Sequence, residues 1–201
     1  MNSVKSRFDE SIKNIRNLHS LYLHLTGKLS FNELLVADIL RSEVVYALAA
    51  LDRFVHDLVL EGILEIYTGR RAQTDAFSKI ILNLNQHQIL SSSNIPEFEL
   101  KQIIVEKHQY QSFQEPDKMT NALSLIWNEP HKWQKIAQAM GQSEQDVKVE
   151  LKNNVIRRNQ IVHESDIDLF TGLQTPILNS DVEGSVNFID TLCNKIFDLV
   201  K

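Results

Sequence analysis

The sequence predicts an all-α bundle, and two observations support this fold class. Glycine and proline are scarce, at 6 and 4 of the 201 residues, so few positions interrupt a helix. Apolar residues recur every three or four positions over several long segments, whereas no alternating apolar and polar run is long enough to predict a sheet. Hydrophobic residues make up 43% of the chain, which is enough for one sizeable core. Residues 1–201 are therefore expected to form one domain.

Two long helices are expected in the N-terminal third of the chain. The first spans residues 4–25, where apolar side chains lie at helical spacing. The second begins at Ser30-Phe-Asn-Glu33, a pattern typical of a capping box, with Leu29 and Leu34 placed as a hydrophobic staple. Apolar residues continue over 34–67, so this helix should be buried on much of its circumference. We expect it at the centre of the bundle.

Two further capping patterns predict the long helices of the C-terminal half. They are Ser143-Glu-Gln-Asp146 and Ser180-Asp-Val-Glu183, and each opens an amphipathic segment. Shorter helices are predicted at 76–84, 97–111, 118–127 and 130–140. Loops are predicted at 91–97, 111–117 and 166–179, where turn-forming residues gather.

Composition excludes several kinds of site. A net charge of -5, from 21 basic and 26 acidic residues, argues against a protein held on nucleic acid by bulk positive charge. The single cysteine, Cys193, excludes an intramolecular disulfide and a cysteine-based zinc site. A chain without disulfides is most consistent with a protein of the reducing cytoplasm. Histidines outside 153–165 show no metal-ligand spacing, so we expect neither a metal nor a cofactor.

The chain is expected to act inside the cell and away from the membrane. Its first ten residues, MNSVKSRFDE, do not resemble a charged leader followed by an apolar segment. The longest apolar run, 44–51, is far shorter than the roughly 20 residues that span a bilayer. A cytoplasmic protein is the expectation that follows.

The stretch NNVIRRNQIVHES, residues 153–165, places polar groups on the apolar side of a predicted helix. Arg158 lies on this apolar stripe, and Asn159 and His163, four residues apart, share an adjoining face. The apolar members of the stripe are Val147, Leu151, Val155 and Val162. Because a buried guanidinium is costly unless it is compensated, Arg158 should meet a carboxylate partner or a bound anion.

A purely structural explanation of Arg158 remains open at this point. The arginine would then pair with a carboxylate of the central helix, either Asp52 or Glu43. In the functional alternative, Arg41, Asp52 and His56, which fall close to one side of that helix, support the polar motif. Asp52 and His56 could equally pair with each other at a spacing of four.

The segment Arg158-Asn159-Gln-Ile-Val-His163 resembles the signature of the HEPN superfamily, an arginine followed after four to six residues by a histidine. Its setting, VVYALAALDRFVHD at 44–57 and RRNQIVHESDID at 157–168, resembles the RiboL-PSP-HEPN branch. The resemblance implies a four-helix bundle with additional helices and a metal-independent endoribonuclease. It also implies a homodimer in which two motifs face each other. Many members occur in toxin-antitoxin, phage-defence or stress-response systems.

The resemblance assigns roles that suit the chemistry of these side chains. His163 would take or give a proton near neutral pH, and Arg158 would stabilise charge on the phosphoryl oxygens. Asn159 would orient the histidine or donate to phosphate, and Arg157 could add a second phosphate contact. Asp52 and His56 are expected as supporting residues. The expected partners are RNA, a second copy of the chain, and an antitoxin or another regulatory protein.

One departure from a related pattern limits the expected partners. In HEPN toxins silenced by a nucleotidyltransferase, a tyrosine lies two places after the histidine, whereas here Glu164 and Ser165 follow. A nucleotidyltransferase partner is therefore not implied. Two other functions stay open, namely a catalytically silent HEPN scaffold that binds RNA or protein, and a cleft that binds a nucleotide or another anion.

Overall fold

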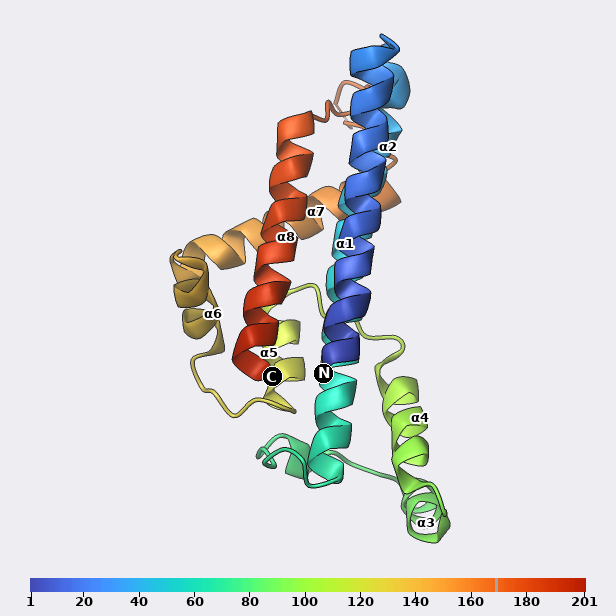
Figure 1. Ribbon diagram of the computed structural model, residues 1–201, viewed down its shortest axis with the longest axis vertical. Coiled ribbons are helices and arrows are strands. Elements are labelled where there is room, and N and C mark those ends of the chain that lie inside the picture. The colour runs from blue at the N-terminus through green and yellow to red at the C-terminus, as the bar shows by residue number, and fades with distance from the viewer. Residues whose placement is uncertain (169) are drawn as a thin grey trace.

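A computed structural model describes residues 1–168 and 170–201 of the chain, and it confirms the all-α prediction (Figure 1). Within these two ranges, β pairing is confined to one antiparallel bridge between Ile167 and Gln174. The α-helices are α1 (Asn2–Leu23), α2 (Glu33–Tyr67), α3 (Leu84–Ser92), α4 (Pro96–His108), α5 (Pro116–Ser124), α6 (Lys132–Met140), α7 (Glu144–His163) and α8 (Asn179–Val200).

Helix α2 is the central element, as predicted from its apolar content. It packs against α1, α4, α5, α7 and α8. Figure 1 shows α1, α2 and α8 side by side along the long axis of the molecule, with α7 running across them. A π-helical turn, His24–Lys28, ends α1 and leads the chain back into α2. None of the helices in the described ranges is long and apolar enough to cross a membrane.

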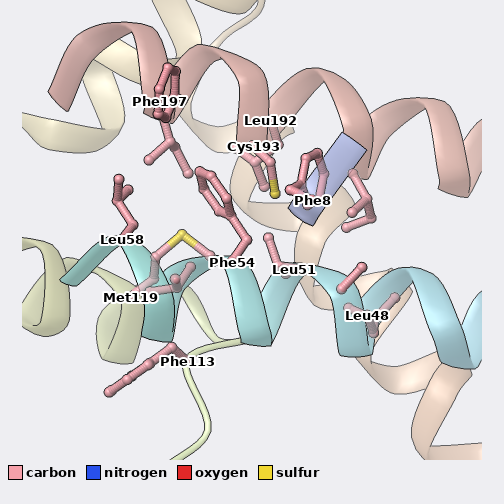
Figure 2. Packing of buried hydrophobic residues seen from close by; sticks show 14 of the residues in the cluster. Phe8, Leu48, Leu51, Phe54, Leu58, Phe113, Met119, Leu192, Cys193 and Phe197 are labelled. Carbon is pink, nitrogen blue, oxygen red and sulfur yellow. The ribbon is translucent and has the colours of Figure 1, made fainter. Parts of the chain in front are cut away.

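The core is filled by apolar side chains from both ends of the sequence (Figure 2). Phe8 of α1 and Phe54 of α2 pack with ring centroids 5.1 Å apart. Cys193 of α8 is fully buried as a free thiol, and burial raises its pKa well above the ordinary value. On the side of α2 that faces away from α8, Phe113 packs from the segment between α4 and α5.

The start of α2 differs from the prediction. Asn32, and not Ser30, caps the helix, because its side chain accepts a hydrogen bond from the backbone N–H of Leu34 at 2.9 Å. Leu29 and Leu34 are both exposed, so the predicted staple is wrong. The cap of α7 is confirmed, since the Ser143 hydroxyl accepts from the backbone N–H of Asp146 at 3.1 Å.

Three of the four short helices are confirmed by α4, α5 and α6, whereas the one predicted at 76–84 is wrong. That segment contains a 3-10 turn, Phe77–Lys79, and only its last residue, Leu84, belongs to an α-helix. The next helix begins later because Asn83 and Gln86 form a capping box that fixes its first turn. Helix α8 begins at Asn179, one residue before the predicted cap at Ser180, and has no side-chain cap.

Candidate functional site

Helix α7 is anchored at its N-terminal half and half-exposed at its C-terminal half. Val147 and Leu151 are fully buried, and Val155 is half-buried. Val162, predicted on the same buried stripe, is 48% exposed, so this part of the prediction is wrong. The stripe therefore leaves the core between Val155 and Val162. Arg158 lies at this transition and is half-buried.

The guanidinium of Arg158 is held by neutral amides. Its Nη1 donates to Oδ1 of Asn159 at 3.0 Å, and its Nη2 donates to Oε1 of Gln114 at 2.6 Å. Across residues 1–168 and 170–201, Arg158 forms no salt bridge, so the predicted structural pairing with Asp52 or Glu43 is not observed. The amides fix the position of the guanidinium without neutralising its charge.

Arg158 faces a cavity of about 520 Å³ between α2, α4 and α7. A cavity of this size is typical of small-molecule sites. Polar and charged side chains line it together with aliphatic ones from α2 and α4. The polar and charged members are Asp52, Arg53, His56, Asp57, His108, Gln109, Gln114 and Arg158.

Asp52 and His56 line this cavity but bond to the backbone, not to the arginine. Oδ1 of Asp52 accepts from the backbone N–H of Phe113 at 2.6 Å. Nε2 of His56 lies 3.1 Å from the carbonyl oxygen of Gln111, and it must donate because a carbonyl only accepts. Both contacts hold the segment that carries Gln114, and they replace the predicted bond between Asp52 and His56.

Two residues of the site were missed at the sequence level. Gln114 is buried on the segment between α4 and α5, and His108 ends α4. Burial, with smaller effects of His56 and Lys107, lowers the pKa of His108, so its ring is uncharged at neutral pH. Neither residue has a local spacing that links it to Arg158, because only tertiary packing brings these segments together.

Half-buried Arg157 and buried Arg41 form a separate cluster around buried Asp166. Arg157 donates to both carboxylate oxygens of Asp166, in one case at 2.9 Å. Nε of Arg41 donates to the same carboxylate at 2.6 Å, and its Nη2 donates to the carbonyl of Thr175 at 2.8 Å. The guanidinium of Arg157 is therefore bonded to Asp166, next to the motif. Arg41 does not line the cavity of Asp52 and His56, so its expected grouping with these two residues is not observed.

His163 is the last residue of α7 and is exposed. In the part of the chain that the structure describes, its ring makes no hydrogen bond. Five residues along a helix correspond to a rotation of about 140°, so His163 lies outside the cavity of Arg158. The bond from Arg158 to Asn159 turns the guanidinium toward the face that Asn159 and His163 share.

Residues within the described ranges form no cluster of histidine, cysteine, aspartate and glutamate that could hold a metal ion. The family model described as RiboL-PSP-HEPN matches residues 5–201. This match covers α2 to α8, all of α1 except its first three residues, and all the residues of the cavity. No curated protein and no solved structure matches the chain.

Proposed function

Because the chain belongs to the RiboL-PSP-HEPN family, we propose that it is a metal-independent endoribonuclease built around Arg158 and His163. The observation that carries the proposal is that the guanidinium of Arg158 lines a cavity and is bonded by two neutral amides instead of a carboxylate. A guanidinium without a carboxylate partner keeps its charge available for a phosphate group, and its planar fork matches two phosphoryl oxygens.

The reaction needs only the groups of this chain and the RNA. The 2′-oxygen attacks the adjacent phosphorus, the new bond from the 2′-oxygen to phosphorus forms, and the bond from phosphorus to the 5′-oxygen breaks. A base removes the 2′-proton, and an acid protonates the leaving 5′-oxygen. Arg158 stabilises the charge on the phosphoryl oxygens in the transition state. The products are a 2′,3′-cyclic phosphate and a free 5′-hydroxyl.

His163 supplies one proton-transfer group per chain, and the second comes from a second copy. One imidazole per motif leaves either the acid or the base unsupplied, and a two-fold dimer would bring a second copy of Arg158 and His163 into one cleft. Ile156, 46% exposed, lies on the same face as Asn159 and His163 and offers an apolar contact for the partner helix.

The proposed setting is a stress-response, toxin or phage-defence system in which a regulatory protein restrains the enzyme.

Cleavage assays in excess EDTA test the proposal. Wild-type protein should cut labelled tRNA or mRNA, whereas Arg158→Ala and His163→Ala should reduce the rate at least about 100-fold. Arg70→Ala and His131→Ala, which remove an exposed arginine and an exposed histidine outside this cavity, serve as matched controls. A DNA strand with one internal ribonucleotide should be cut only after that ribonucleotide. Cleavage that depends on added metal, or that persists in Arg158→Ala, contradicts the proposal.

A catalytically silent RNA-binding scaffold is the second candidate. It is favoured by the position of His163 outside the cavity that contains Arg158. In that case the wild type binds RNA without turnover, and Arg158→Ala weakens binding whereas His163→Ala does not. Binding to a non-cleavable RNA, measured beside cleavage, separates the two functions.

A further inference from the structure

A second cavity lies beside the first, and His108 lines both. The second cavity, of about 510 Å³, is bordered by the segment between α4 and α5 and by α5. Lys118 contributes a cation to it, and Tyr110 contributes an aromatic ring that is 92% exposed. Nζ of Lys118 also lies 2.9 Å from Oε1 of Glu115, in an exposed ion pair of the kind that contributes little to stability and that a phosphate can replace. The first cavity contains the guanidinium of Arg158. Each cavity therefore combines a cation with the shared ring of His108.

The boundary between the two cavities is formed by His108 and Phe113, and side chains of α2 contact it. The rings of His108 and Phe113 meet edge to face with their centroids 5.6 Å apart, and the ring of His56 lies 4.4 Å from that of Phe113. Asp52 fixes the backbone N–H of Phe113 at 2.6 Å. The segment that separates Arg158 from Lys118 is thus positioned by α2, which favours a preformed surface.

Two neighbouring cavities that each contain a cation, with ring surfaces between the two cations, suit an unpaired nucleic-acid strand. Phosphates follow the cations, and bases stack on the rings. A paired helix presents phosphates but no free base faces, because its bases are stacked on one another within the duplex. The uncharged ring of His108 at neutral pH suits contact with a base more than contact with a phosphate.

We propose that the two cavities joined at His108 form a binding track for single-stranded RNA, with one phosphate at Arg158, a later phosphate at Lys118, and bases on His108 and Tyr110. The inference rests on the proposed function for its ligand, since it names the class of RNA that reaches Arg158. It assigns Tyr110 and Lys118 to substrate binding and selects unpaired regions of RNA as the substrate.

Binding of a fluorescent, 2′-O-methylated RNA oligonucleotide tests the track independently of cleavage. The wild type should prefer the single strand to the same strand annealed to its complement by at least about 10-fold. Tyr110→Ala should weaken single-strand binding on the order of 10-fold. Tyr67→Ala, which removes another exposed tyrosine that lines neither cavity, should leave binding unchanged.

Salt dependence tests the cationic end of the track. Lys118→Ala should weaken binding and lower the slope of log affinity against log salt by about 0.7, the value for one phosphate contact on a single strand. Lys135→Ala, an exposed lysine of α6 that lines neither cavity, is the matched control. Both substitutions affect exposed side chains, so the fold should be retained.

The outcomes separate the track from the nuclease proposal. Equal binding of duplex and single strand, unchanged binding by both Tyr110→Ala and Lys118→Ala, or no RNA binding by the wild type overturns the track. If duplex and single strand bind equally, or if both substitutions leave binding unchanged, but the wild type still cleaves RNA, then the track is wrong and the nuclease proposal is retained. Single-strand binding that depends on Tyr110 and Lys118, without any cleavage, supports the track and overturns the nuclease.

Discussion

At the scale of single residues, Glu43 and His19 form a polar contact at the edge of the core. Glu43 of α2 is 1% exposed, and its Oε2 lies 2.9 Å from Nδ1 of His19. The other ring nitrogen of His19 lies 2.8 Å from Glu183 of α8. A neutral imidazole has one N–H and cannot donate to both carboxylates, so the three groups together retain an additional proton. Burial raises the pKa of Glu43, although the bond to His19 opposes the shift.

The raised pKa of Glu43 predicts a pH dependence of stability. The folded protein holds the proton of Glu43 more tightly than the unfolded chain, so the free energy of unfolding falls as pH rises from the ordinary value of 4.5 through the raised pKa. Urea unfolding at successive pH values should show the wild type losing stability over this window relative to Glu43→Gln. Glu183→Gln, on the half-exposed side of the same histidine, should show a smaller change. Parallel curves for the wild type and Glu43→Gln would contradict the assignment.

Replacing one carboxylate oxygen of Asp166 by an amide nitrogen should strongly lower the stability of the protein. Asp166→Asn leaves Arg41 and Arg157 without their shared carboxylate in a buried site, which should cost about 3–5 kcal/mol. Asparagine tolerates the positive φ of 57° at this position, so the loss reports the charge and not the backbone. Thermal unfolding measures it. Asp38→Asn, which removes an 85%-exposed carboxylate beside the same Arg41, should change stability little.

At the scale of elements, Gly62 marks a close approach between α2 and the segment after α5. A Cβ atom at Gly62 would lie 2.6 Å from Cγ2 and 2.8 Å from Cβ of Ile126, which is a buried residue. These atoms are close to the backbone of Ile126 and do not move aside easily. Glycine is therefore required here for packing, although it lowers the helix propensity of α2.

Alanine at two helical glycines should have opposite effects. Gly62→Ala should destabilise the protein by about 1–3 kcal/mol, because overpacking outweighs the gain in helix propensity. Gly184→Ala in α8, where a Cβ atom would meet nothing within 4 Å, should stabilise it by about 0.5–1 kcal/mol. Urea unfolding of both variants measures the difference. A gain in stability for Gly62→Ala would show that Ile126 moves freely.

The long helices were predictable because each carries a sustained apolar period, whereas the capping patterns identified the correct cap only for α7. Ser143 was identified as the cap of α7, but the competing caps Ser30 and Asn32 lie two residues apart and local sequence does not rank them. Within the candidate site, the motif on α7 was predicted from its resemblance and its helical spacing, and Asp52 and His56 of α2, which line the same cavity, were expected as supporting residues. Gln114 and His108 come from distant segments, and their positions depend on how Asp52 and His56 hold the chain between α4 and α5.

At the scale of the whole molecule, a composite site predicts how mixed dimers behave. If each active cleft needs a histidine from both chains, a dimer with one His163→Ala chain is inactive. After exchange of equal amounts of wild type and His163→Ala, about a quarter of the dimers keep both histidines, so about a quarter of the activity should remain. RNA cleavage at fixed total protein measures it. If about half of the wild-type activity remained, each chain would act alone.

The buried Cys193 gives the protein an internal reporter of global opening. It is the only cysteine of the chain and lies fully enclosed in α8 against the core. A thiol reagent reaches such a group only while the bundle is open, so the rate of its modification follows the population of the opened state when reclosure is fast. Every variant described above can thus be ranked by one chemical label at a native position, in dilute solution and without denaturant.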